Sequence, residues 1–182
     1  MTIRFLLFIY MFVLGVLSIN NPAFAAETTT EGKLKAAYLF NFLRFIEWPD
    51  IPDKKINLCV AGDKDSYHGA LIALSTQSVN QNSIDLHFFN GNYEKQIKYL
   101  NECQLLFITD IKQKSEHEIL EEISSLSILT VGENPQFMQH GGMINFVRST
   151  NKIRFQVNMK AVKKTDIRIS SKILRLADKV IE

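Results

Sequence analysis

Two cysteines, Cys59 and Cys103, are the residues of this 182-residue chain that could most readily react with each other. Cys59 lies in the apolar run 56–62, and Cys103 opens a second run, 103–109. Both runs lack polar alternation, which is typical of strands that are covered on both faces in a parallel sheet. In an oxidising compartment, cysteines on neighbouring strands can form a disulfide. The alternative is two buried free thiols, because unpaired cysteine is among the most buried residue types.

Other residue types that carry chemistry do not form a catalytic or metal-binding pattern. Two thiols without a second pair of ligands fall short of a tetrahedral zinc site. The sequence contains no nucleophile elbow, no C-x-x-C pair and no glycine-rich phosphate loop. We therefore predict no catalytic residues, no metal and no cofactor, and a protein that is not an enzyme. The histidines also lack metal-ligand spacing: His68, His87, His117 and His140.

Asp63 and Asp65 are the remaining candidates for a small-molecule site. They follow the strand expected at 55–61, and an open α/β sheet often binds its ligand beyond the carboxyl ends of its strands. The loop has one glycine, which does not make a phosphate-binding pattern. These two residues therefore matter only if the protein senses a small molecule.

The first 25 residues have the three parts of a secretory signal peptide. Arg4 precedes an apolar run of thirteen residues, 5–17, and Ala23 and Ala25 supply the small residues of a cleavage site. An uncleaved anchor is the alternative, but a helix that crosses about 30 Å of hydrocarbon needs roughly 20 apolar residues. We therefore predict that the chain is secreted, that the signal peptide is cleaved near Ala25, and that the mature chain does not insert into a membrane.

The rest of the chain is predicted to form one domain. Residues 26–33 are polar and threonine-rich and are expected to be a flexible leader, and the domain is expected to span residues 34–182. The formal net charge of the whole chain is +2, and it falls to +1 when Arg4 is removed with the signal peptide. This near-neutral balance argues against a general nucleic-acid binder, which usually carries a concentrated basic excess.

Strand patterns alternate with helical patterns along this domain. Strands are expected near 55–61, 84–89, 104–109 and 127–132, with helices near 66–75, 93–101 and 115–125 between them. This alternation predicts an α/β fold with a mostly parallel central sheet flanked by helices. A C-terminal antiparallel hairpin, with strands at 143–148 and 153–158, and two short helices, near 159–164 and 170–179, are expected to complete it.

The opening helix, expected at 34–48 and ended by Pro49, is apolar around nearly its whole circumference. A helix of this kind must be buried on more than one side. One interpretation is a core helix that packs on the sheet. The other is an interface with a partner chain through Phe42, Phe45 or Trp48, because aromatic residues are enriched at binding hot spots.

In the last helix, unlike the opening helix, basic and apolar residues lie on opposite sides. Lys172 and Arg175 lie opposite an apolar stripe, and they form either a solvated face or a contact for an acidic partner. Arg148, at the end of the first hairpin strand, is a third cation that could bind a carboxylate in a fixed geometry. The stripe that should pack on the core consists of Ile169, Ile173, Leu176, Ala177 and Val180.

Three motifs, in this order, resemble the YfiR family. The first is K-A-A-Y-L-F-N-F at 35–42, followed by F-I-E-W-P at 45–49. The second is the pair of cysteine-bearing strands, L-C-V-A-G at 58–62 and C-Q-L-L-F-I at 103–108. The third is the C-terminal block from G-G-M-I-N-F-V at 141–147 to residue 177. Together they cover the expected domain, with Gln156 and Asp166 as departures from the family pattern that bear on partner specificity.

The resemblance implies a periplasmic, non-enzymatic and homodimeric α/β protein. Relatives of this type bind the periplasmic sensor domain of a membrane-bound diguanylate cyclase and hold it inactive, so that loss of the regulator raises cyclic di-GMP and promotes biofilm. It also implies that oxidation of the Cys59–Cys103 pair stabilises the regulator and links it to envelope redox state.

Similar domains are attached to sensor kinases, which keeps a second hypothesis open. In that alternative, the protein is a periplasmic small-molecule-sensing domain that acts on a kinase or another receptor. Its pocket would lie near Asp63, Asp65 or Arg148.

Overall fold

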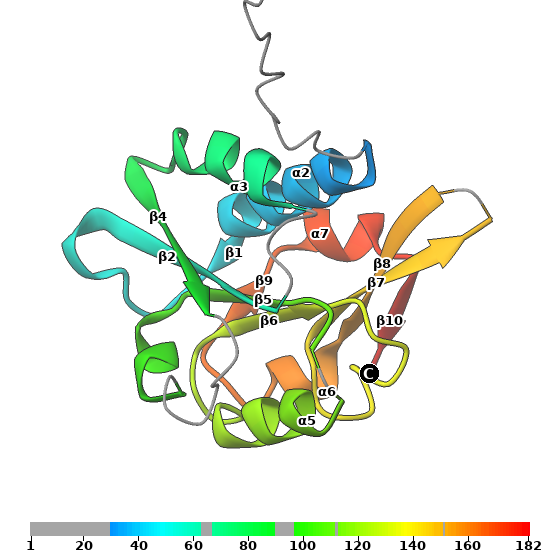
Figure 1. Ribbon diagram of the computed structural model, residues 1–182. Helices are drawn as coiled ribbons and strands as arrows, with labels where there is room; N and C mark the ends of the chain where they lie inside the picture. The colour runs from blue at the N-terminus through cyan, green and yellow to red at the C-terminus, as the bar shows by residue number, and fades with distance from the viewer. Residues whose placement is uncertain (1–29, 63–66, 90–96, 112, 151) are drawn as a thin grey trace, which may run out of the picture.

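The computed structural model describes residues 30–62, 67–89, 97–111, 113–150 and 152–182, so the expected signal peptide, Asp63 and Asp65 lie outside the described residues. An eight-stranded sheet forms the centre of the protein (Figure 1). Five strands, β4, β2, β5, β6 and β7, run parallel, and β7 and β8 form an antiparallel hairpin. The α/β prediction, with a mostly parallel sheet and a C-terminal hairpin, is confirmed. In spatial order the strands are β10 (Lys179–Ile181), β8 (Lys152–Asn158), β7 (Ile144–Ser149), β6 (Leu129–Gly132), β5 (Leu105–Ile108), β2 (Lys55–Ala61), β4 (Asn82–Phe89) and β3 (Ser78–Val79).

Helices cover both faces of this sheet. Figure 1 shows α2 (Thr30–Phe45), α3 (His68–Ser75) and α7 (Ser171–Leu176) on one face, with α5 (Gln113–Glu122) and α6 (Met159–Val162) on the other. Two 3₁₀ helices, η1 (Pro52–Lys54) and η2 (Ile97–Glu102), precede β2 and β5. A separate two-stranded ribbon joins β1 (Ile46–Glu47) to β9 (Arg168–Ile169).

The opening helix differs from the prediction at both ends. It begins at Thr30, inside the expected leader, and it ends at Phe45 rather than at Trp48. It ends early because Ile46 and Glu47 leave the helix to pair with β9. That pairing depends on a segment more than 120 residues away in the sequence, which local periodicity does not report.

The last helix is also shorter than predicted. It ends at Leu176, and residues 179–181 continue as the edge strand β10, parallel to β8. The amide N–H of Asp178 donates to the carbonyl of Phe155 at 2.8 Å, which starts this pairing. Ile173 is buried as expected, but Leu176 is 58% exposed, so its predicted place in the core-facing stripe is wrong.

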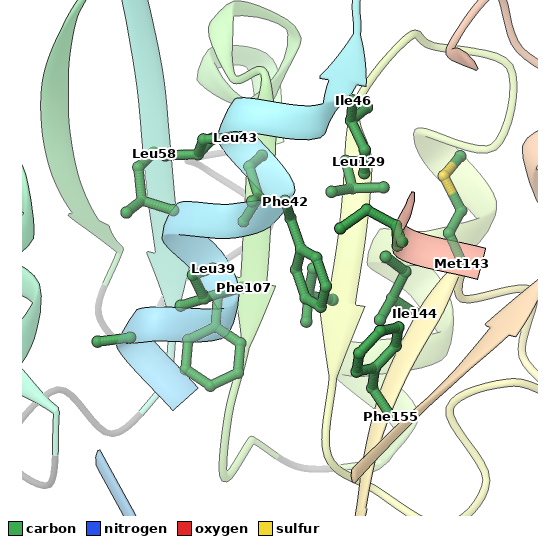
Figure 2. Packing of buried hydrophobic residues seen from close by; sticks show 14 of the residues in the cluster. Leu39, Phe42, Leu43, Ile46, Leu58, Phe107, Leu129, Met143, Ile144 and Phe155 are labelled. Carbon is green, nitrogen blue, oxygen red and sulfur yellow. The ribbon is translucent and has the colours of Figure 1, made fainter. Parts of the chain in front are cut away.

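Phe42 lies at the centre of the core between α2 and the sheet. Its side chain has no exposed surface, and its ring lies 5.1 Å from that of Phe155 in an edge-on arrangement and 6.1 Å from that of Phe146. Figure 2 shows Phe42 pointing from α2 toward Ile144 and Phe155. The core interpretation therefore holds at this position, and the prediction that Phe42 contacts a partner is wrong.

We expect Phe42→Ala to lower the free energy of unfolding by about 3–5 kcal/mol, because the truncation leaves a cavity among aromatic rings. Urea unfolding followed by circular dichroism measures this loss. Phe45→Ala is the matched control, since the side chain of Phe45 is only partly buried and should cost clearly less. Equal losses in the two variants would contradict the assignment of Phe42 to the core.

Candidate functional site

A buried polar cluster lies at the carboxyl ends of the parallel strands. Thr109 follows β5, Glu133 follows β6, and Tyr67 directly precedes α3. Lys35 of α2 is 4% exposed, and its ammonium group donates to Tyr67 at 3.1 Å, to Glu31 at 2.8 Å and to Glu133. Glu133 in turn accepts from the hydroxyl of Tyr67 at 2.9 Å and from that of Thr109. We call these five residues the Lys35 cluster.

The close approach of two strand ends supports this cluster. Gly62 follows β2 with φ at +117°, and a Cβ atom at this position would lie 1.6 Å from the carbonyl oxygen of Thr109. Only glycine readily adopts this positive φ, and only glycine lacks the Cβ atom that would collide with Thr109. The Thr109 N–H donates to the carbonyl of Ala61 at 2.9 Å, so that β2 holds Thr109 beside Glu133.

The charges of the cluster stabilise one another. Burial alone would lower the pKa of the Lys35 ammonium, but its hydrogen bonds to Glu133 and Glu31 outweigh burial and raise that pKa well above its usual range. Burial, together with the negative charge of Glu133, raises the pKa of the Tyr67 phenol. The hydrogen bond from Lys35 lowers the pKa of Glu31. The stabilisation from Glu31 is therefore present above pH 4.5 and is lost as the pH falls through its lowered pKa.

The Lys35 cluster is built to hold elements together. The ammonium group has three hydrogens and three acceptors, so none is left for a substrate. The cluster connects α2 to the segments that follow β5 and β6 and to the start of α3. Its chemistry is that of a structural ion pair, which fixes the position of α2 on the sheet.

We expect Lys35→Met to lower the free energy of unfolding by about 3 kcal/mol at pH 7, because Glu133 keeps a largely buried charge without its cation. The double variant Lys35→Met, Glu133→Leu should recover most of this loss, since an apolar pair needs no compensating charge. Lys33→Met, at an exposed position on the same helix, is the control and should stay within about 0.5 kcal/mol. A Lys35→Met variant as stable as the control would contradict a structural role for this ion pair.

Cys59 and Cys103 form a disulfide, with their Cα atoms 5.9 Å apart, so the bridge predicted from the sequence is confirmed and the free-thiol alternative is wrong. Cys59 lies on β2, opposite Leu106 of β5, whereas Cys103 lies just after η2. The two residues are 1% and 3% exposed in a second core cluster, on the other face of the sheet from Phe42. Reductants therefore reach the bridge only if this core opens.

We expect the double variant Cys59→Ala, Cys103→Ala to lose about 3–4 kcal/mol of unfolding free energy, because the bridge closes a loop with a sequence separation of 44. Urea unfolding of the variant and of the oxidised parent measures the difference. Thiol titration of the denatured parent without reductant is the control and should find no free thiol. Two reactive thiols per chain would contradict the bridge.

An exposed cation–aromatic patch lies where α7 passes the end of α2. The Nζ atom of Lys172 lies 4.9 Å from the ring centroid of Phe45, and the guanidinium of Arg44 lies 5.3 Å from the same centroid. Arg175 extends along α7 and donates to Ser171 at 3.3 Å. Lys172, Arg175 and Leu176 are all exposed on α7. We call Arg44, Phe45, Lys172, Arg175 and Leu176 the α7 patch.

Two other predicted partner residues have contacts within the chain. The indole N–H of Trp48 donates to the carbonyl of Gln104 at 2.8 Å, which holds the half-buried ring against the start of β5. Arg148, at the exposed end of β7, forms an ion pair with Glu31 of α2. Arg148 also lines a hollow of about 410 Å³ between α2 and the β7–β8 hairpin, together with Leu34, Tyr38, Lys152 and Arg154.

In the folded protein, two histidines that show no ligand spacing in the sequence, His117 and His140, lie close together. The rings of His117 and His140 lie 5.1 Å apart, and Nδ1 of His140 lies 3.0 Å from a carboxylate oxygen of the buried Glu116. Within the described residues, no group of three or more histidine, cysteine or acidic side chains could hold a metal ion. None of the described helices is both long and apolar enough to cross a membrane.

The chain is similar to known proteins in sequence and in fold. A model of the YfiR/HmsC-like family matches residues 32–178. Among curated proteins, none matches.

Solved structures with this fold include an ABC domain in complex with L-Trp from Streptococcus pneumonia, with a TM-score of 0.58 and 9% identity over 80% of this chain and 60% of that one. A conserved domain protein from Vibrio cholerae has a TM-score of 0.57 and 10% identity, over 80% of this chain and 59% of that one. The chain thus spans about three fifths of the length of both structures, and at this identity the likeness is one of fold alone.

Proposed function

Because the chain belongs to the YfiR/HmsC-like family, we propose that it binds the periplasmic sensor domain of an inner-membrane diguanylate cyclase and holds that enzyme inactive. Family membership supports a periplasmic regulatory role in cyclic di-GMP signalling in general, and a regulatory rather than a catalytic domain. The proposal goes further than family membership on four points. The partner is a diguanylate cyclase, the effect on it is repression, the regulator is a homodimer, and loss of the regulator promotes biofilm.

The α7 patch supports a protein partner. Lys172 lies over the half-buried ring of Phe45, and Arg175 and Leu176 are exposed on the same helix. Arginine hydrogen bonds to carboxylates are strong and geometrically specific, and aromatic and arginine side chains are enriched at interface hot spots. A partner segment with an acidic and an apolar residue side by side would satisfy both components of this patch.

The disulfide supports export of the protein. A buried bridge of this kind forms and persists in oxidising compartments, of which the bacterial periplasm is one. Secretion by a signal peptide that is cleaved near Ala25 remains a prediction, because residues 1–29 lie outside the described part of the chain. We further propose that the bridge stabilises the regulator and that its reduction, after the surrounding core opens, links the protein to envelope redox state.

We expect Arg175→Glu to stay folded, to reach the periplasm at the level of the parent, and to bind the cognate cyclase at least tenfold more weakly. Charge reversal at an exposed position changes stability by about 0.5 kcal/mol or less, whereas like charges at an interface cost far more. Pull-down from solubilised inner membranes measures binding, and the cellular level of cyclic di-GMP measures repression.

Lys160→Glu is the matched control for this experiment, because Lys160 is an exposed cation on α6, on the other face of the sheet. It should bind and repress like the parent. If Arg175→Glu also binds and represses like the parent, the α7 patch is a solvated surface and the proposed contact is wrong.

One observation favours the second candidate function, a small-molecule sensor that acts on a kinase or another receptor. The hollow beside Arg148 is lined by three cations, Arg148, Lys152 and Arg154, and by a single acidic residue, Glu31, which suits an anionic ligand. In that case regulation would be lost with Arg148→Glu and kept with Arg175→Glu. Pull-down from solubilised inner membranes separates the two functions, because the first requires a cyclase as the partner and the second a kinase or another receptor.

A further inference from the structure

A small hollow beside α5 brings two histidines together. His117 of α5 and His140, in the segment between β6 and β7, both line this hollow, which has a volume of about 190 Å³. Their ring centroids lie 5.1 Å apart. Two imidazoles that share a tetrahedral zinc ion, with Zn–N bonds of about 2.1 Å, have ring centroids about 5 Å apart. The separation of the two rings therefore suits a shared metal ion.

A buried carboxylate orients one of these rings. The side chain of Glu116 is 3% exposed, and one of its oxygens lies 3.0 Å from Nδ1 of His140. A carboxylate only accepts hydrogen bonds, so in the neutral ring Nδ1 carries the hydrogen and Nε2 keeps its lone pair. Metal-binding histidines in proteins commonly have this arrangement, in which the carboxylate fixes the ring and raises its basicity. His140 is thus prepared to bind an ion through Nε2.

The segment that carries His140 is held firmly in place. Phe137 has no exposed surface, and a Cβ atom on Gly132 or on Gly142 would lie only 2.3 or 2.1 Å from its ring. The N–H of His140 donates to the carbonyl of Gln136 at 3.1 Å, which restrains the backbone next to the ring. A ligand that is fixed before the ion arrives loses little freedom on binding.

His117 supplies a second imidazole that can adjust its position. Its side chain is 56% exposed, and its Nε2 lies 4.0 Å from a carboxylate oxygen of Glu121, one turn further along α5. This oxygen is too distant to be a third ligand, but it can accept a hydrogen bond from a water molecule on the ion. Among the described residues that line the hollow, Lys164 is the one cation, and its exposed side chain can turn into solvent. The carboxylates of Glu116 and Glu121 therefore favour a positive ion here.

We propose that His117 and Nε2 of His140 bind a divalent transition-metal ion such as Zn²⁺, with water in the remaining positions. Imidazole is a preferred ligand of Zn²⁺, Cu²⁺ and Ni²⁺, whereas Mg²⁺ and Ca²⁺ prefer oxygen. A site with two protein ligands is open to solvent, and it is distinct from a group of three or more binding side chains, which the described residues do not form. The bound ion would join α5 to the segment that precedes β7. The site does not depend on the proposed repression of a cyclase.

Calorimetric titration of the mature, oxidised protein without an affinity tag, using ZnCl₂, tests this site. We expect one zinc ion per chain, and no thiol competes for it, because both cysteines are bridged. Glu116→Gln keeps an acceptor for Nδ1 of His140 but loses the charge, and it should raise the dissociation constant about tenfold. His117→Gln and His140→Gln each remove one of two ligands and should raise it by at least as much. An unchanged constant in Glu116→Gln would contradict the orienting role of this carboxylate.

His87→Gln is the matched control, because His87 of β4 is likewise exposed and its Nε2 lies 3.8 Å from a carboxylate oxygen of Asp85. This variant should bind zinc like the parent, and MgCl₂ should not displace the zinc. In NMR spectra of the imidazole groups, zinc should shift the signals of His117 and His140 and leave those of His87 in place.

Two results would overturn the proposal. One is a parent protein that binds no zinc at millimolar concentration, and the other is zinc binding that survives unchanged in the double variant His117→Gln, His140→Gln. Neither result would bear on the regulatory function, which fails separately if Arg175→Glu still binds and represses.

Discussion

The docking of α2 on the central sheet is the constraint on which the candidate surfaces depend. Its apolar face enters the core (Figure 2), and Lys35 connects its first turns to Glu133 beyond the end of β6. The same helix reaches the hollow beside Arg148 through Glu31, and it reaches the α7 patch through Phe45. A shift of α2 would therefore change both surfaces that could bind a partner or a ligand.

Apolar packing and the buried ion pair constrain this helix in different ways. Burial of large side chains supplies most of the free energy, but it tolerates small changes of position. A buried ion pair contributes little net stability, because desolvation of the charges offsets their attraction. It strongly disfavours other positions of α2 on the sheet, because any position that separates Lys35 from Glu133 leaves a largely buried charge without a partner. The pair thus selects one position among those that packing would allow.

The disulfide and the proposed contact surfaces lie in separate parts of the molecule. The bridge belongs to the core cluster on the face opposite α2 and constrains β2 and the end of η2. The α7 patch lies on the opposite face of the sheet, which carries α2 and α7.

Local patterns in the sequence determined the class of the fold, the hairpin and the exposure of Lys172 and Arg175, because strand and helix periodicity depend on neighbouring residues. Tertiary structure decided the rest. Only the folded chain closes the Cys59–Cys103 bridge, and only the folded chain places Glu133 beside Lys35, 98 residues away. Pairing with distant strands also ended two helices earlier than their apolar patterns predict. Burial, bridges and ion pairs depend on what meets across the sheet, and a single sequence does not report those distances.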